Sequence, residues 1–211
     1  MIRNFGPVIF FCTAIIGLLI LYECKKSSRS RQSAKDGFWK REARANTVRR
    51  KDITFLNYIT IPMDSLPFVN TDDDELLEYH DKITSLSHKK ILNLTGYSNT
   101  DLKEQYGVAN LSVLSEYDDN YSTLVNIISR WGMRLITLNY INEAVTVLEY
   151  GISIGTDVSR NYYLLADIYL KRGEPGKIDS LIESASGINS IMKSSIIDKL
   201  NEMRHMQAKS F

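Results

Sequence analysis

The apolar residues in the second half of this chain recur every three or four positions, a spacing typical of helices. Between residues 120 and 138 they form one side of a predicted helix: Leu124, Ile127, Ile128, Trp131, Leu135 and Leu138. The same spacing predicts further helices over 141–154, 158–172, 175–186 and 190–206, the second of them capped by Asp157. Because turn-forming residues separate each helix from the next, the pattern predicts an all-α fold.

The segment Val125–Ala185 also repeats itself with a period of about 34 residues. Shifting the sequence by that period aligns residues of similar character: Ile128 with Tyr162, Trp131 with Leu165, Gly132 with Ala166, Leu135 with Tyr169, Leu148 with Ile182 and Gly151 with Ala185. A fixed period of this length is the signature of stacked helix-turn-helix units. We therefore expect two such units over residues 120–188.

The N-terminal stretch 5–22 has no charged residue and follows a short tail, residues 1–4. A run of about 18 apolar residues is close to the length that spans a bilayer core as a helix. It exceeds the apolar core of a usual signal peptide, and no small-residue cleavage site follows it. We expect an uncleaved transmembrane helix; the alternative is an N-terminal secretion signal.

Residues 23–51 form a basic segment that leads into an acidic body. Eleven Lys or Arg residues against three acids give this segment a net charge of +8, whereas residues 52–211 have a net charge of −8. Basic residues beside a membrane span indicate the cytoplasmic side. We expect a single-pass protein of the cell membrane with a cytoplasmic body. Residues 25–51 would contact anionic lipid or form a solvated linker.

Residues 52–70 differ from the segments on both sides. The run Tyr58, Ile59 and Thr60 favours an extended backbone, because β-branched and aromatic residues suit that conformation. Pro62 and Pro67 prevent a helix through this stretch. We expect an extended arm that either packs on the helical body or occupies a groove, in its own chain or in a partner.

Two further segments flank the expected repeats without sharing their period. Residues 71–119 are predicted to form an irregular helical cover, with one helix capped by Thr71 and another stopped by Gly107. Residues 189–211 carry a last helix with a half-polar side that suits the end of a stack. Because a stable stack usually needs at least about three units, we expect these segments, or a partner, to supply the missing faces.

Small residues stand where the two helices of each unit are expected to touch: Gly132, Ala144 and Gly151, then Ala166 and Ala185. With the period and the turn-like runs 139–144 and 172–174, these positions resemble the tetratricopeptide repeat. Ile178 replaces the family's alanine, Thr156 replaces a frequent proline, and Trp131 stands one turn later than the family's tryptophan. The resemblance implies antiparallel helix pairs that pack closely through the small residues and Trp131.

The resemblance further implies a face that binds a protein or peptide partner and is lined by the first helix of each unit. On this sequence that face carries Asn126, Ser129, Met133, Ile136, Thr137, Arg160, Tyr163, Asp167, Leu170 and Lys171. The mixed charges of this set do not resemble the strongly basic clamp with which some members of the family hold a C-terminal carboxylate.

Residues that could carry chemistry are sparse in this chain. His80, His88 and His205 are scattered without the spacing of a metal site. There is no glycine-rich phosphate loop and no nucleophile elbow. Both cysteines, Cys12 and Cys24, precede the body, which excludes a disulfide-dependent domain. We expect no cofactor, no metal and no enzymatic activity, and the acidic body disfavours nucleic acid.

These features predict a membrane-anchored scaffold that binds a protein or peptide partner through a helical-repeat domain, with self-association as a further way to complete the stack. Two alternatives remain open. One is a secreted or outward-facing helical binding protein, and the other is an enzyme on an unfamiliar helical scaffold.

Overall fold

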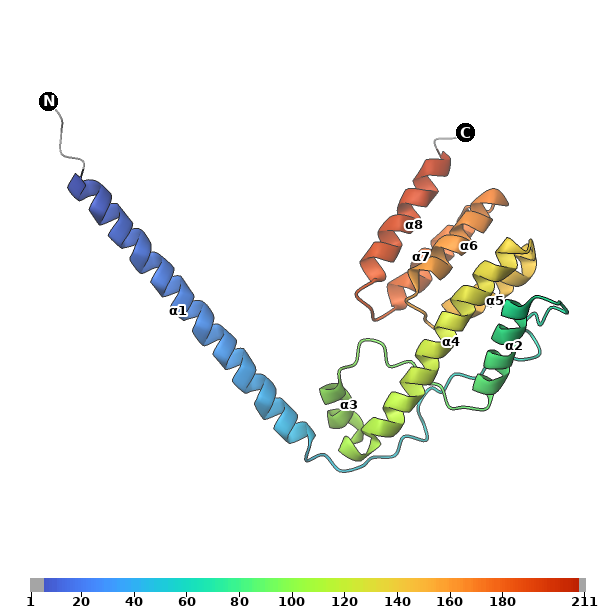
Figure 1. The fold of residues 1–211 in the computed structure, drawn as a ribbon, viewed down its shortest axis with the longest axis horizontal. Helices are drawn as coiled ribbons and strands as arrows, with labels where there is room; N and C mark the ends of the chain where they lie inside the picture. The colour runs from blue at the N-terminus through green and yellow to red at the C-terminus, as the bar shows by residue number, and fades with distance from the viewer. Residues whose placement is uncertain (1–5, 209–211) are drawn as a thin grey trace. The chain divides into compact units, whose positions relative to one another are not determined.

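The computed structural model describes residues 6–208, and all regular structure in this part of the chain is helical (Figure 1). The prediction of an all-α fold is therefore confirmed. The chain divides into two compact units. Unit 1 contains the chain up to Lys51 together with Asn99–Ala109, and unit 2 contains Asp52–Ser98 and the chain from Asn110 onward.

Unit 1 is built from α1 (Gly6–Ala45) and α3 (Asn99–Tyr106). Residues 23–45 are helical, not a linker, because Lys, Arg, Ala and Glu are good helix formers and no proline interrupts them. The Arg41 guanidinium lies 2.5 Å from Asp101 and 2.6 Å from Glu104. Glu42 pairs with Lys103 and accepts a hydrogen bond from Thr100. Part of the basic charge of α1 is thus neutralised within unit 1.

The expected transmembrane helix over residues 5–22 is not supported. Within residues 6–208, none of the helices combines the length and the apolar character that crossing a membrane requires. The uncharged part of α1 ends at Tyr22. The same helix continues directly into Lys25 and Lys26. The prediction of a single-pass cell-membrane protein is corrected accordingly; Phe5 lies outside the described residues.

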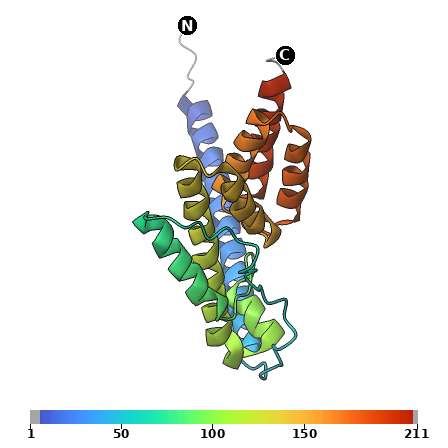
Figure 2. The same ribbon diagram turned by 90° about the vertical axis from the view of Figure 1, so that its right-hand side faces the viewer.

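The first helix of unit 2 is α2, and the helices α4 to α8 follow it. Their bounds are α2 (Asp74–Ser87), α4 (Leu111–Thr137), α5 (Ile141–Ser153), α6 (Ser159–Lys171), α7 (Gly176–Gly187) and α8 (Lys193–Ala208). A short 3-10 turn, Val108–Asn110, precedes α4. From α4 to α8 each helix packs on the next; α4 also contacts α2 and α6, and α6 also contacts α8. Both ribbon views show α6, α7 and α8 side by side (Figures 1 and 2).

The helix boundaries differ from the sequence prediction at three places. The predicted helix near 120 begins at Leu111, because no glycine or proline separates it from the preceding helical piece. Asp73 rather than Thr71 caps α2, by accepting a hydrogen bond from the Leu76 N–H at 3.0 Å. Asp157 does not cap α6, which follows Val158 without a side-chain cap; its carboxylate accepts from the Ser190 hydroxyl.

Close helix contacts at small residues hold the hairpins of unit 2 together. The six residues expected to pack the repeats are all buried: Trp131, Gly132, Ala144, Gly151, Ala166 and Ala185. A Cβ on Gly132 would lie 2.6 Å from the Leu148 side chain, and one on Gly151 would lie 2.9 Å from Ile128. Since non-bonded carbons prefer separations near 3.5–4.0 Å, only glycine allows α4 and α5 to approach this closely.

The arm over residues 52–70 contains no helix or strand and packs on the body of unit 2. Ile61 and Leu66 are buried in the same core as Trp131. The Ile59 N–H donates to the Ile91 carbonyl at 2.9 Å. The Phe68 ring lies 5.6 Å from the Trp131 ring, centroid to centroid. Of the two arrangements that the sequence allows, the structure therefore has the arm packed on the body.

Candidate functional site

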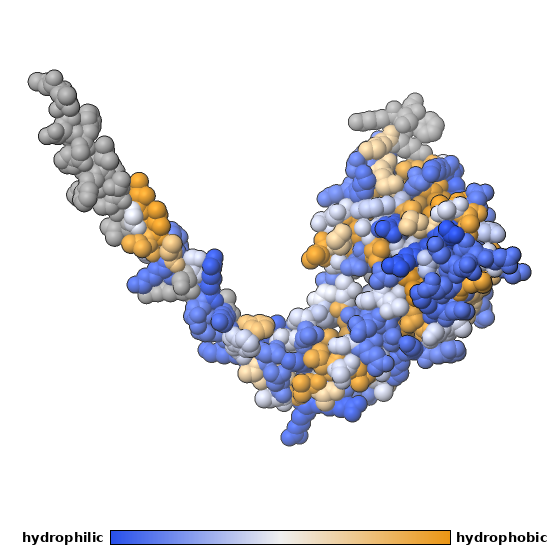
Figure 3. Space-filling model, in the orientation of Figure 1, coloured by the Kyte–Doolittle hydropathy of each residue, from blue (hydrophilic) through white to orange (hydrophobic). Residues whose placement is uncertain are grey.

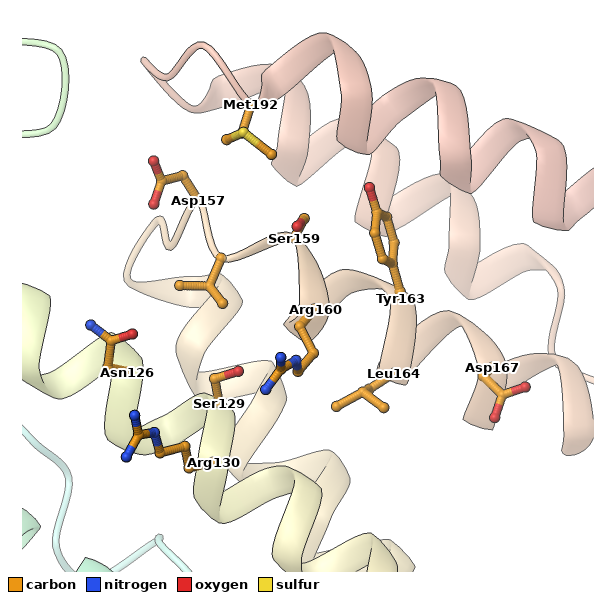
Figure 4. Close-up of a pocket in the computed structure, with 11 residues that line it drawn as sticks. Asn126, Ser129, Arg130, Asp157, Ser159, Arg160, Tyr163, Leu164, Asp167 and Met192 are labelled. Atoms are coloured by element: carbon orange, nitrogen blue, oxygen red, sulfur yellow. The ribbon is translucent and has the colours of Figure 1, made fainter.

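One hollow among the described residues lies between α4 and α6, with a volume of about 840 Å³ (Figure 4). We call it the α4–α6 pocket. It is lined by Asn126, Ser129, Arg130, Asp157, Val158, Ser159, Arg160, Tyr163, Leu164, Asp167 and Met192. The surrounding surface of unit 2 is mostly hydrophilic, with apolar residues exposed in small separate areas (Figure 3).

Helical spacing brings the lining residues to the pocket. On α4 they stand at positions 126, 129 and 130, and on α6 at 160, 163, 164 and 167. Residues three or four apart share one side of a helix. Each helix thus turns one side to the pocket and the opposite, apolar side to the core. Met192, from the segment before α8, adds an apolar contact at the rim.

Hydrogen bonds in the α5–α6 turn fix the end of the pocket at which α6 begins. The Tyr162 hydroxyl donates to the Thr156 carbonyl at 2.9 Å, and the Val158 N–H donates to Thr156 Oγ1 at 3.1 Å. The Tyr121 hydroxyl, on α4, donates to the Gly155 carbonyl at 2.9 Å. Burial raises the pKa of Tyr162 to about 12, so this donor keeps its proton. The start of α6 is therefore held in place against α4.

The charged residues of the pocket differ in whether they already have a partner. The Asp157 carboxylate accepts from the Ser190 hydroxyl at 2.7 Å, and Asp167 pairs with Lys171 at 2.6 Å. Arg130 and Arg160, by contrast, are exposed and make no ion pair with any residue from 6 to 208. The pocket therefore offers two unpaired guanidinium groups and two carboxylates that are already engaged.

Ser129 is the most buried polar side chain of the pocket. Its residue is 4% exposed, yet its hydroxyl has no hydrogen-bond partner among the described residues. Figure 4 shows it between the side chains of Arg130 and Arg160. Although the residue is buried, its hydroxyl oxygen remains accessible from the pocket, where water or a ligand can complete its hydrogen bonding. Ser129 is thus a polar anchor available to a bound molecule.

Five of the residues predicted to bind a partner line the pocket together: Asn126, Ser129, Arg160, Tyr163 and Asp167. Of the other five, Met133, Thr137 and Lys171 are exposed outside it. They stand further toward the C-terminal ends of α4 and α6, whereas the pocket lies beside the start of α6. Ile136 and Leu170 are partly buried at the edge of the core instead.

The pocket also contains residues that were not predicted from the sequence to bind a partner. Arg130 and Leu164 are adjacent to predicted residues and share the same side of their helices, so a wider helical face would have included them. Asp157 and Val158 belong to the turn before α6, and Ser159 is the first residue of that helix. Met192 comes from outside the repeats, and no periodicity in the sequence could have assigned it to this site.

A second hollow of about 370 Å³ lies between α5 and α7. Its polar groups already bond to each other. The Tyr169 hydroxyl donates to Glu149 at 2.5 Å, and the Lys177 ammonium lies 4.8 Å from the centre of the Tyr169 ring. Because these groups are paired, this hollow offers a ligand fewer free contacts than the α4–α6 pocket does.

The three histidines do not converge. His80 is buried on α2 against the rings of Phe68 and Trp131, and burial lowers its pKa below the ordinary value. His88 and His205 are exposed. Across residues 6–208 no group of three metal-ligating side chains lies close together.

We compared the chain with known proteins by sequence family, by individual sequence and by structure. No protein family, no curated protein sequence and no solved structure matches it.

Proposed function

We propose that unit 2 is a protein-interaction domain that binds an extended segment of a protein partner in the α4–α6 pocket. In this proposal α4–α5 and α6–α7 are two tetratricopeptide-like units. The period of about 34 residues and the buried small residues at the helix contacts support this reading. The flanking helices α2 and α8 pack on α4 and α6 and thereby cover the ends of the short stack.

The observation that carries the proposal is the convergence of α4 and α6 on one pocket. Five residues chosen from the repeat pattern line it, although they come from two helices separated by α5. A coincidental surface hollow has no reason to use equivalent sides of two repeated helices. The agreement between repeat register and pocket lining therefore favours a binding site.

The chemical character of the pocket favours a peptide over a small apolar ligand. Small-molecule sites are lined mainly by apolar and aromatic side chains with a few polar groups. Here only Val158, Leu164 and Met192 are aliphatic, and most other lining residues are charged or polar. A polypeptide offers both backbone hydrogen bonds and varied side chains, which suits a mixed surface of this kind.

Site-specific photo-crosslinking in cells that naturally contain the protein tests this proposal. A photoreactive phenylalanine analogue replaces Tyr163 in one form of the full chain and Tyr97 in a matched form. Tyr97 is an exposed tyrosine that lies outside the pocket, whereas Tyr163 is partly buried. We expect a discrete protein adduct from position 163 that is absent from position 97. Adducts of the same mass and yield at both positions, or none from 163, would reject the pocket as the binding site.

A further inference from the structure

We propose that the floor of the α4–α6 pocket binds the carboxylate of an internal Asp or Glu residue of the partner, next to an apolar residue. This inference rests on the proposed function and names the kind of peptide that the pocket takes. The groups that would hold the carboxylate are Ser129, Arg130 and Arg160.

The two arginines provide the charge for this site. Both guanidinium groups are free of ion pairs within residues 6–208, and both belong to the lining of one pocket. A guanidinium is always charged and offers a planar pair of donors that fits the two oxygens of a carboxylate. The charge of Arg130 also acts on Glu78 of α2, but Glu78 already pairs with Lys82.

Ser129 supplies a second and independent observation. It is more than nine-tenths buried, lies between the two arginines and has no partner for its hydroxyl in the described chain. A hydroxyl in this position can donate to an oxygen held by the guanidinium groups. Nearby, α6 begins without a side-chain cap. Unsatisfied N–H groups at a helix start favour negative charge.

The two carboxylates of the pocket indicate that a carboxylate fits better than a phosphate. Asp157 lies at one end of the pocket and Asp167 at the other (Figure 4). A phosphorylated side chain carries nearly two negative charges at neutral pH, and both acids would repel it. A carboxylate carries one charge, which two guanidinium groups more than balance. The pocket therefore suits an Asp or Glu side chain.

The pocket also has apolar residues beside the arginines. They favour an apolar peptide residue next to the bound acid. Leu164 stands next to Tyr163 on α6, and Met192 faces them from the segment before α8. The Tyr163 hydroxyl points to α8, where it donates to the Ser195 carbonyl at 3.4 Å, and its ring remains in the pocket wall. An aliphatic or aromatic residue adjacent to the acid would bury its side chain against this wall.

The test uses the full chain and peptide libraries blocked at both ends. One library fixes a Glu followed by a Leu, and its partner library has Gln in place of Glu. A third has phosphoserine at that position, and a fourth has no acidic residue but a free C-terminus. Binding is measured with wild type, with Arg130→Gln, Arg160→Gln and Tyr163→Ala, and with Arg172→Gln as a control. Arg172 is an exposed arginine outside the pocket that donates to Asn142.

We expect the glutamate library to bind about tenfold or more tightly than the glutamine library, because hydrogen bonds to charged groups are the strong ones. Arg130→Gln and Arg160→Gln should each remove most of that preference, and Arg172→Gln should keep it. Unfolding midpoints equal to wild type show that the variants are folded.

The other outcomes separate this inference from the proposed function. Equal binding of the glutamate and glutamine libraries, lost with Tyr163→Ala but kept with Arg160→Gln, would overturn the carboxylate site and leave peptide binding intact. Tighter binding of phosphoserine, or of the free C-terminus, would overturn the assignment to an internal acid. Failure of every library to bind would overturn both proposals.

Discussion

Within a single turn of α4, the side chains on its two sides have different surroundings. On the core side, Trp131 and Gly132 are buried, and the neighbouring helix approaches so closely that no Cβ fits at Gly132. On the pocket side, the side chains of Ser129 and Arg130 have no hydrogen-bond or ion-pair partner within residues 6–208. The core side is determined by shape and completed inside unit 2, whereas the pocket side offers unsatisfied polar groups.

Structural and functional residues on one helix can therefore be distinguished by how substitutions affect stability and binding. Substitutions on the core side should lower the stability of unit 2 without a specific effect on binding. Substitutions on the pocket side should leave stability almost unchanged and alter binding. The substitutions below test this difference between core and pocket residues, in α4 and in the helices α2 and α6 that contact it. They are ordered by their expected effect on stability.

Trp131→Ala should destabilise the protein most. Trp131 is fully buried and contacts the rings of Phe68 and His80, and removing a buried aromatic side chain costs about 3–5 kcal/mol. The control is Trp39→Ala, which removes the other tryptophan from an exposed position in unit 1. Urea unfolding followed by far-UV circular dichroism measures both. Similar losses from the two variants would contradict the assigned core.

Gly132→Val should destabilise by about 1–3 kcal/mol, because the added side chain forces the Leu148 side chain and α5 to move. Gly176→Val is the matched control, since a Cβ at Gly176 meets no atom within 4 Å. The same unfolding measurement applies. A Gly132→Val protein as stable as the control would show that α4 and α5 do not approach as closely as described.

Asp73→Ala should cost about 1 kcal/mol, because Asp73 caps α2. The Arg134 guanidinium and the Leu76 N–H hold the pKa of the Asp73 carboxyl below its ordinary value. The ionised form is thus favoured in the folded state, and its contribution is lost as pH falls below the ordinary aspartate range. Asp72→Ala, which alters an exposed neighbour, should have less effect at neutral pH. Equal effects of both variants would rule out the cap.

Stability should also decrease as pH falls below the ordinary histidine range of about 6.5, because of His80. Burial lowers its pKa in the folded protein, so the unfolded state binds the proton more readily and acid favours unfolding. His80→Phe keeps a ring against Phe68 and Trp131 and should reduce this dependence. The midpoint of urea unfolding, determined at several pH values between neutral and mildly acidic, would measure this pH dependence of stability. An unchanged slope in His80→Phe would contradict the assignment.

Arg160→Gln should change stability least, by no more than about 0.5 kcal/mol, because surface substitutions away from caps and cores usually fall in that range. Arg160 is exposed and has no ion pair in the described chain to lose. The unfolding midpoint should therefore match wild type. A clear loss of stability would show that Arg160 is a structural residue.

The core side was largely predictable from the sequence, and the pocket only in part. Apolar spacing and small residues such as Gly132 and Gly151 repeat with the helices, because close packing must recur in every unit. Asn126, Ser129 and Tyr163 were predicted from the resemblance to the tetratricopeptide repeat. Met192 was not, because its place depends on how the segment before α8 folds back, which no local pattern encodes.

Other differences between the predicted and the observed structure arise where neighbouring residues could each begin a helix or where composition and charge favour different structures. Thr71 and Asp157 both have side chains suited to a helix start, yet Asp73 caps α2, and Asp157 bonds to Ser190 instead. Tertiary contacts decide between such neighbours. The basic segment 23–45 looked like a linker from its charge, although its composition also favours the helix that it forms.

Peptide binding in the α4–α6 pocket is tested by following the backbone amides of the full chain by NMR while the blocked glutamate peptide library is added. We expect the amides of Ser129, Arg160 and Tyr163 to shift with increasing peptide. Those of Gly132 and Gly151, on the core side of the same hairpins, should remain in place. Shifts confined to the core side, or no shift at any of these five amides, would show that the α4–α6 pocket does not bind the peptide.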